Sequence, residues 1–575
     1  MAEPVIEFKD FSFRYKSQNA DTLKHINLVI NKGEKVLILG PSGSGKSTLG
    51  NCINGLIPFS FEGEIKGSCK VAGIETKEAN IFTLSAHVGT VQQDTDAQFI
   101  GLSVGEDIAF SLENDAEERS VMLEKVELAA KAADIDGFLS EVPYNLSGGQ
   151  KQKVALAGVM HNGVDILLFD EPLAALDPTM GNTAIDLIDR IQREQERTVI
   201  IIEHRLEDVL YRHVDRVILV SDGEIALDTT PDELLRSDIL KESGIREPLY
   251  ISALKNAGVV FDREDHLEDI NTIDISRYEQ ALKSHFETHR ASLSNPVVSE
   301  EVILEVRDVS FSYESVKALN HISFDIHKGE RISVIGKNGA GKSTMAKLLC
   351  GIERPQEGSI TFKGTNVLEL SIREIGKLIG YVMQNPNQML IKDIIKEEVE
   401  LAMVLNEYPQ AEIDANVESV LRMCDLYGMR NWPVAVLSYG QRKRVTIASI
   451  LSLRPDILIV DEPTAGQDYH HYTEIMSFLE QLNREYHITI LFITHDMHLA
   501  IEYTDRSLVF SDGELIADDN VFKVLSDTEV IRKANLKETS LVTLAEKAGI
   551  PPEEFIHAFI EEERRIRNEH ETTVH

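Results

Sequence analysis

Two glycine-rich segments have the residue types and the spacing of loops that bind phosphate groups. The stretches GPSGSGKS at 40–47 and GKNGAGKS at 336–343 both fit G-x-x-x-x-G-K-[ST], and each follows a short apolar segment. Glycines let backbone N–H groups converge on phosphate oxygens, and the following helix start adds partial positive charge. The sequence therefore predicts two nucleotide-binding loops, in which lysine reaches the terminal phosphates and serine can bind Mg²⁺. The predicted binding residues are Gly40, Ser42, Gly43, Gly45, Lys46, Ser47 and Thr48, and Gly336, Asn338, Gly339, Gly341, Lys342, Ser343 and Thr344.

Paired acidic residues end two further apolar segments, LLFDE at 167–171 and LIVDE at 458–462. We expect Asp170 and Asp461 to hold Mg²⁺, and Glu171 and Glu462 to polarise the water that attacks the nucleotide. An acid that only caps a helix is the alternative. An acid pair at the end of a buried strand is better explained by an ion or a water molecule that it serves.

Two histidines and two glutamines recur in the same order in both halves. His204 and His495 follow the next apolar segments, TVIIIEH and TILFITH, and are expected near the γ-phosphate. Gln93 and Gln384 begin the polar stretches QDTDAQF and QNPNQM, where a glutamine can sense Mg²⁺ and water. A structural histidine or a surface glutamine is the alternative for each residue taken alone, but repetition favours the nucleotide site.

An aromatic residue precedes each phosphate loop. Tyr15 and Tyr313 lie upstream of the first and second loops, where a ring could stack on adenine. The alternative, which stays open, is a strand tyrosine that packs on the core.

A third motif, LSGGQKQKV at 146–154, returns as LSYGQRKRV at 437–445. A serine and a glycine there begin a segment that reads as a helix rich in Lys and Arg, which is a second anion-binding helix start. Each half already has a phosphate loop, so a second anion-binding site in the same half has no evident use. It has a use if it completes the nucleotide site of the other half. Tyr439 replaces Gly148 in the second copy, and we interpret it as an asymmetry between two competent sites.

These motifs need a folded domain to position them, and the pattern of apolar segments predicts two such domains. Short, almost continuous apolar segments alternate with helical stretches, which predicts an α/β fold with a mainly parallel sheet buried on both faces. The predicted domains are residues 1–245 and 301–535, joined by a helical appendage and acidic linker at 246–300 and followed by a helical appendage at 536–575.

Composition excludes several classes of function. The 575 residues carry 95 Asp and Glu against 58 Lys and Arg, a formal charge of −37, which opposes binding to nucleic acid. The 4 cysteines include no CxxC pair, which argues against cysteine-ligated zinc or iron–sulfur clusters. No apolar run approaches the roughly 18 residues that span a bilayer. A role at a membrane would therefore need another chain for the membrane part.

Together the motifs resemble the ATP-binding subunits of ABC transporters, over nearly the whole chain. The resemblance implies two tandem P-loop NTPase domains, each with an antiparallel β subdomain and a helical subdomain that carries the signature motif. It also implies head-to-tail pairing, in which ATP and Mg²⁺ lie between the phosphate loop of one half and the signature of the other. The implied signature contacts are Ser147, Gly149 and Gln150 in the first half and Ser438, Gly440 and Gln441 in the second, with Asp177 and Asp468 in the adjoining loops.

The glutamine stretches QQDTDAQF and QNPNQM further resemble those of energy-coupling factor (ECF) and cobalt importers. Asp94 and Thr95 depart from the Asn-Pro of that pattern. The resemblance implies one fused chain per transporter, peripheral on the cytoplasmic face of the cell membrane. Its partners would be a transmembrane coupling protein and a membrane-embedded binding protein for a vitamin or metal ion.

Two alternatives stay open at this point. Twin-cassette ATPases also act on ribosomes, but such proteins usually carry a basic arm between the cassettes, whereas this connector contains the acidic stretch DREDHLEDI. The motor of another importer or exporter class is the second alternative, against which the glutamine stretches argue.

Overall fold

The computed structural model describes residues 3–93, 98–160, 163–174, 176, 178–290, 299–314, 316–464 and 467–574. It divides into two compact units, which are described separately below. The first unit comprises residues 1–278 with 466–470, and the second comprises 279–465 with 471–575. The connector helix α12 (Glu279–Arg290) thus belongs to the second unit.

A six-stranded sheet forms the centre of the first unit, in the order β10-β9-β3-β8-β7-β6. All neighbours in this sheet are parallel except β9 and β10, which pair antiparallel at one edge. Its strands are β3 (Lys35–Leu39), β6 (Val88–Val91), β7 (Ile166–Asp170), β8 (Thr198–Ile202), β9 (Arg216–Ser221) and β10 (Glu224–Thr229). The apolar segments are buried along nearly their whole length, as expected for strands covered on both faces.

A second, antiparallel sheet of the first unit has the order β2-β1-β4-β5. Its strands are β1 (Pro4–Tyr15), β2 (Leu23–Asn31), β4 (Gly63–Val71) and β5 (Ile74–Glu75). One hydrophobic core joins both sheets to the helix after the phosphate loop, since Phe8 and Phe13 of β1 cluster with Ile38 of β3 and Leu49 of that helix. This packing fixes the loop against the sheet.

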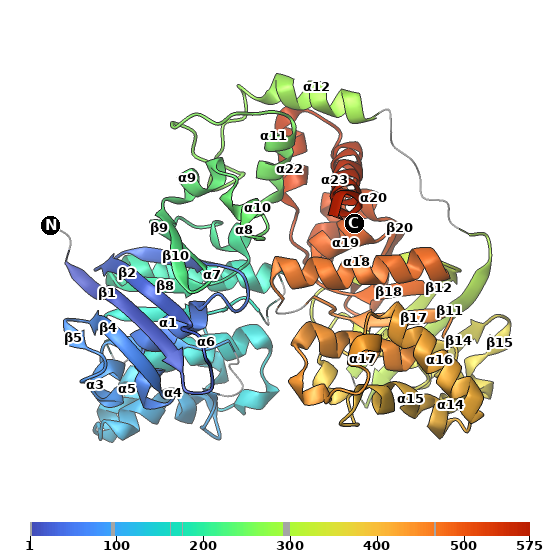
Figure 1. The fold of residues 1–575 in the computed structure, drawn as a ribbon, viewed down its shortest axis with the longest axis horizontal. Coiled ribbons are helices and arrows are strands. Elements are labelled where there is room, and N and C mark those ends of the chain that lie inside the picture. The colour runs from blue at the N-terminus through green and yellow to red at the C-terminus, as the bar shows by residue number, and fades with distance from the viewer. Residues whose placement is uncertain are drawn as a thin grey trace. The chain divides into compact units, whose positions relative to one another are not determined.

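The second unit repeats both sheets, in the orders β16-β17-β18-β13-β19-β20 and β12-β11-β14-β15. The strands are β11 (Val302–Tyr313), β12 (Val316–His327), β13 (Arg331–Ile335), β14 (Glu357–Phe362), β15 (Thr365–Asn366), β16 (Ile379–Val382), β17 (Ile457–Asp461), β18 (Thr489–Ile493), β19 (Arg506–Ser511) and β20 (Glu514–Asn520). The predicted duplication of an α/β unit is therefore confirmed (Figure 1).

Helices surround the sheets of each unit. Those up to the connector are α1 (Lys46–Ile53), α2 (Leu56–Phe59), α3 (Ile81–Ser85), α4 (Val104–Asn114), α5 (Arg119–Ala132), α6 (Gly148–Met160), α7 (Pro178–Gln195), α8 (Leu206–Val209), α9 (Pro231–Arg236), α10 (Ile239–Glu242) and α11 (Leu249–Asn256). Helices α4, α5 and α6 share a separate core that includes Val104, Ile108 and Val154. They form the helical subdomain that carries the signature motif at the start of α6.

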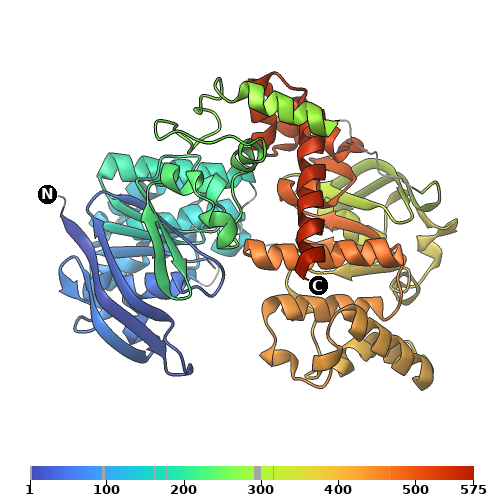
Figure 2. The same cartoon turned by 45° about the horizontal axis from the view of Figure 1, so that its top comes forward.

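The later helices are α13 (Lys342–Leu349), α14 (Ile372–Ile375), α15 (Ile395–Leu405), α16 (Gln410–Met423), α17 (Tyr439–Leu451), α18 (Tyr469–Tyr486), α19 (Met497–Tyr503), α20 (Val521–Ser526), α21 (Thr528–Ala534), α22 (Ser540–Ala548) and α23 (Pro552–Val574). Figures 1 and 2 both show α12 beside α22 and α23 within the second unit. Phe555 and Phe559 of α23 are buried, so this helix docks on its own unit through an apolar face.

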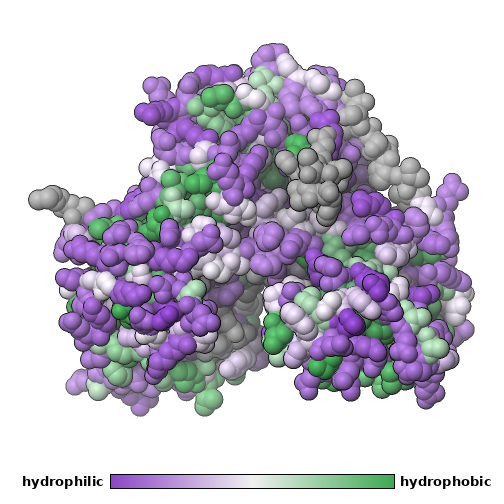
Figure 3. Space-filling model, in the orientation of Figure 1, coloured by the Kyte–Doolittle hydropathy of each residue, from purple (hydrophilic) through white to green (hydrophobic). Residues whose placement is uncertain are grey.

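The surface agrees with the acidic composition. Figure 3 shows mainly hydrophilic residues on the face in view, with hydrophobic ones in smaller groups. Among helices in the described ranges, none combines the length and apolar character needed to cross a membrane. All 4 cysteines are buried free thiols.

Candidate functional site

The first phosphate loop connects β3 to α1 and requires glycine at specific positions. Gly40 and Gly45 have φ of +154° and +106°, in the region that side chains disfavour. A Cβ on Gly40 would lie 2.2 Å from the backbone oxygen of Val220. The Nζ of Lys46 donates to the carbonyls of Gly40 and Pro41 at 2.7 and 2.9 Å. The loop is therefore held in a tight curve by its own buried lysine.

The second phosphate loop has the same construction between β13 and α13. Gly336 and Gly341 have φ of +149° and +106°, and a Cβ on Gly336 would lie 2.2 Å from the carbonyl oxygen of Phe510. The Nζ of Lys342 donates to the carbonyls of Gly336 and Lys337 at 2.5 and 3.0 Å. Both predicted loops thus have the conformation in which backbone N–H groups can cradle phosphate.

Four predicted residues meet beside the first phosphate loop. Asp170 ends β7 and accepts a hydrogen bond from the Oγ of Ser47 at 3.3 Å. Glu171 follows with a positive φ of 49°, and its Oε2 accepts from the Nε2 of Gln93 at 2.5 Å. Burial raises the pKa of both Asp170 and Glu171, because it disfavours their charged forms. An acid pair, a hydroxyl and an amide therefore converge at the end of one strand.

The acid pair of the second unit has different partners. Asp461 ends β17 and accepts from the hydroxyl of Tyr381 at 2.6 Å. Glu462 lies 2.7 Å from the Nδ1 of His495 and accepts from the Oγ1 of Thr494 at 3.3 Å. Burial raises the pKa of Asp461. The recurring histidine of the second unit therefore contacts the second acid of the pair directly.

The histidine of the first unit lies between two carboxylates. The Nδ1 of His204 is 3.9 Å from Glu171 but 3.4 Å from Glu203, the residue before it. Glu203 is fully buried and accepts hydrogen bonds from the backbone N–H groups of His204 and Leu173. Sequence reasoning missed this acid. The available signal was that TVIIIEH ends in Glu-His whereas TILFITH ends in Thr-His.

The two recurring glutamines do not have matching surroundings. Gln384 is exposed, and its backbone carbonyl, rather than its amide side chain, accepts hydrogen bonds from Tyr439 and Lys443 at 3.1 and 3.4 Å. The Nζ of Lys443 also donates to the carbonyls of Glu462 and Pro463 at 3.2 and 2.9 Å. Burial lowers the pKa of Lys443 to about 8. This buried lysine joins the glutamine stretch to the acid pair of the second unit.

Each signature serine caps its helix. The Oγ of Ser438 accepts from the backbone N–H of Gln441, whose Oε1 accepts from the N–H of Ser438 at 3.0 Å. Ser147 and Gln150 exchange the same two bonds at the start of α6. The predicted ligand glutamines thus hold the cap closed with their Oε1 atoms. Within each unit, the described residues show no hydrogen bond between this serine and the phosphate loop.

Tyr439 fits its position without backbone strain. It is the first residue of α17, so the site does not require the left-handed φ that would favour glycine. The residue is 38% exposed, and its hydroxyl donates to the carbonyl of Gln384. Gly149 and Gly440 follow the substituted position in the two copies, and each lies in the first turn of its helix.

The two predicted aromatic residues differ in their contacts. The hydroxyl of Tyr15 lies 3.1 Å from the Oγ1 of Thr48, at the start of α1, and its ring meets Phe13 edge to face. The ring of Tyr313 meets Phe311 in the same way and lies 5.9 Å from the Nζ of Lys347. Both tyrosines thus lie by the helix that follows the phosphate loop, and both also pack in the strand layer. Asp94, Thr95 and Asp177 lie outside the described residues.

The donor sets fit a nucleotide with Mg²⁺. A hydroxyl and a carboxylate supply the hard oxygen ligands that Mg²⁺ prefers, and Ser47 with Asp170 already brings such a pair within 3.3 Å. The loops supply convergent backbone donors and a buried lysine for the phosphates.

Comparison with known proteins gives consistent matches. The family model described as ABC transporter matches residues 23–174 and 319–465, and a model described as ATP-binding cassette cobalt transporter matches residues 237–311. An ABC transporter ATP-binding protein of Clostridium perfringens is 53% identical over 98% of this chain and 99% of its own length. An ABC transporter ATP-binding protein of Enterococcus faecalis is 52% identical over 99% of this chain and 100% of its own length. A solved structure of cbiO1 from Clostridium perfringens, part of the complex cbiONQ, is 34% identical, with a TM-score of 0.39, over 43% of this chain and 100% of that chain.

Glu203 precedes His204, whereas Thr494 precedes His495. Exchanging these preceding residues should therefore change ATP turnover in opposite directions at the two sites. Glu203→Thr removes the carboxylate that competes with Glu171 for His204, so turnover of ATP at the first site should rise by about fivefold, roughly 1 kcal/mol on the barrier. The rate is measured in a Glu462→Gln background, which silences the second site. The reciprocal control, Thr494→Glu with Glu171→Gln, should lower turnover at the second site. A rate that is unchanged or lower in Glu203→Thr would contradict competition between the two acids.

The lowered pKa of Lys443 predicts a specific pH dependence of stability. Its folded value of about 8 lies below the ordinary 10.5, so the unfolded chain binds more protons between these values. The contribution of Lys443 to the free energy of unfolding is full above pH 10.5 and is lost as the pH falls through 8. Between these values the free energy of unfolding changes by at most about 1.4 kcal/mol per pH unit. Wild type should therefore gain stability relative to Lys443→Gln, which mirrors Gln152 of the first unit, as pH rises from 8 to 10. Parallel thermal-unfolding midpoints across that range would contradict this assignment.

Proposed function

The chain belongs to the family of ABC transporter ATP-binding proteins, which are ATPases, and from this premise we propose that it is the motor of a membrane importer. The observation that carries the motor part of this proposal is the duplication of a complete set of ATPase parts. Each unit has a phosphate loop, an acid pair at a strand end, a following histidine and a capped signature helix. Two such sets in one chain indicate two sites for ATP.

We assign the parts of each site as follows. Lys46 and Lys342, with the N–H groups of their loops, bind the phosphates of ATP. Ser47 with Asp170, and Ser343 with Asp461, would hold Mg²⁺, which neutralises phosphate charge when bound. Glu171 and Glu462 orient the attacking water and accept its proton.

The raised pKa of Glu171 suits that role, since burial makes its carboxylate a stronger base than an exposed one. His204 and His495 hold these carboxylates, closely in the second unit and at 3.9 Å in the first. Gln93 reaches Glu171 at 2.5 Å and thereby connects the glutamine stretch to the chemistry.

We further propose that each signature helix completes the nucleotide site of the other unit. Ser147 and Ser438 cap the starts of helices. The first N–H groups of these helices carry a partial positive charge, which suits binding of the γ-phosphate. Within its own unit neither serine is hydrogen-bonded to the phosphate loop in the described residues. ATP would then bring the units together, and hydrolysis would release them.

The importer class is proposed from two observations. The model described as a cobalt transporter matches residues 237–311, between the two ranges that the ABC transporter model matches. The glutamine stretches resemble those of ECF and cobalt importers. We therefore propose peripheral attachment at the cytoplasmic face of the membrane. The partners would be a transmembrane coupling protein and a membrane-embedded protein that binds a vitamin or metal ion, with one fused chain per transporter.

Purification from the native membrane tests this proposal. The tagged full chain, extracted with detergent, should recover a multi-spanning coupling protein and a small hydrophobic binding protein, with one ATPase chain for each coupling protein. Extraction from an untagged strain is the control. Recovery with ribosomal particles and no membrane protein would contradict the importer assignment and favour the ribosomal alternative.

A further inference from the structure

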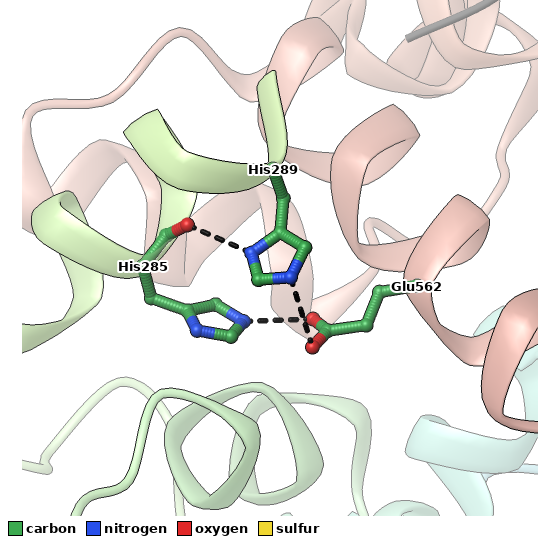
Figure 4. Close-up of side chains that lie close together, drawn as sticks. All are labelled: His285, His289 and Glu562. Carbon is green, nitrogen blue, oxygen red and sulfur yellow. Dashed lines mark hydrogen bonds and ion pairs between the residues drawn. The ribbon is translucent and has the colours of Figure 1, made fainter. Parts of the chain in front are cut away.

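Three side chains of the second unit converge far along the chain from the nucleotide-site motifs. His285 and His289 lie one turn apart on α12, and Glu562 faces both of them from α23 (Figure 4). Each residue offers one ligand atom, and these three atoms lie within 4.8 Å of one another. The Nε2 of His285 is 2.8 Å from the Oε2 of Glu562, and the Nε2 of His289 is 3.6 Å from its Oε1.

The hydrogen bond of His289 determines which of its nitrogens can bind a cation. Its Nδ1 lies 2.9 Å from the backbone carbonyl of His285, and a carbonyl can only accept, so Nδ1 must carry the proton. In the neutral ring the lone pair is then on Nε2, which faces the carboxylate of Glu562. Metal-binding histidines are commonly oriented by this kind of bond from the other nitrogen.

The frame around the cluster is already packed. Phe286 of α12 is buried against Phe555 of α23, with ring centroids 6.2 Å apart, and Arg290 pairs with Glu554 at 2.7 Å. The side chain of Glu562 is only 9% exposed. The ligand atoms therefore stand on two helices that other contacts hold together, which reduces the ordering that binding would require.

We propose that His285, His289 and Glu562 bind a divalent transition-metal ion of the Zn²⁺ class. Two imidazole nitrogens and one carboxylate oxygen suit Zn²⁺, Co²⁺ or Ni²⁺, whereas Mg²⁺ and Ca²⁺ prefer oxygen ligands alone. Three protein ligands leave a further position for water. The bound ion would clamp α12, which precedes the second unit's first strand, onto the C-terminal helix α23.

The positive charge of Arg565 would repel the bound metal ion, and this repulsion distinguishes a metal site from a purely structural contact. The guanidinium of Arg565 lies 3.4 Å from the Nε2 of His289, and its side chain is exposed. This side chain must swing away when the metal binds, and its charge repels the ion. Removal of that charge should therefore strengthen metal binding, an effect that a purely structural His–Glu contact would not show.

Equilibrium binding of Zn²⁺ to the nucleotide-free full chain tests the site. Wild type should bind one more Zn²⁺ than His289→Ala, and Glu562→Gln should weaken that site at least tenfold, the loss that even an outer-shell change produces. Arg565→Gln should tighten it. The control is His321→Ala, which removes an exposed histidine of the same unit that pairs with Asp308 at 2.8 Å, and it should leave Zn²⁺ binding unchanged.

Thermal unfolding keeps the result interpretable if a variant is less stable. Zn²⁺ should raise the unfolding midpoint of wild type and of His321→Ala by the same amount, and that of Glu562→Gln by less. Visible absorption of bound Co²⁺ should likewise be lost in His289→Ala. Equal Zn²⁺ stoichiometry and affinity in wild type, His289→Ala and Glu562→Gln would overturn the proposal.

Discussion

The phosphate loop between a buried strand and the helix that follows it is the constraint on which the remaining structure depends. Its backbone must turn through conformations that side chains disfavour, as at Gly40 and Gly336, against carbonyls that leave no room for a Cβ. Its lysine is buried and bonded to the loop's own carbonyls. The parallel sheet then places the ends of the neighbouring strands, and with them the acid pairs, at the same edge. The chemistry therefore follows from how the sheet is ordered around one loop.

The two units share this loop but differ in the contacts that surround the acid pair. In the second, His495 contacts Glu462 directly, and Tyr381 and Lys443 bond to the acid pair or its backbone. In the first, a buried Glu203 lies beside His204, while Gln93 contacts Glu171. Tyr439 belongs to this pattern, because it opens a helix without strain and bonds to the glutamine stretch. The asymmetry thus extends well beyond the one altered signature residue.

Local sequence was sufficient for the duplicated α/β fold and the conformation of the phosphate loops, because glycine spacing and apolar strands encode them over short distances. It also predicted that the acids would end buried strands. It could not predict the partner of Asp461, since Tyr381 reaches that acid only through the pairing of β16 with β17. The same limit hid the cluster of His285, His289 and Glu562, whose members meet only when α12 packs on α23.

ATP turnover in Glu171→Gln, Glu462→Gln and the double variant tests most directly whether the chain contains two hydrolytic sites built around these acids. Each single variant should lose turnover while still binding ATP, because glutamine keeps the shape of the side chain but cannot accept the proton. The double variant should lose about a hundredfold or more. Wild-type turnover in both single variants, or in the double variant, would contradict the assignment of these carboxylates.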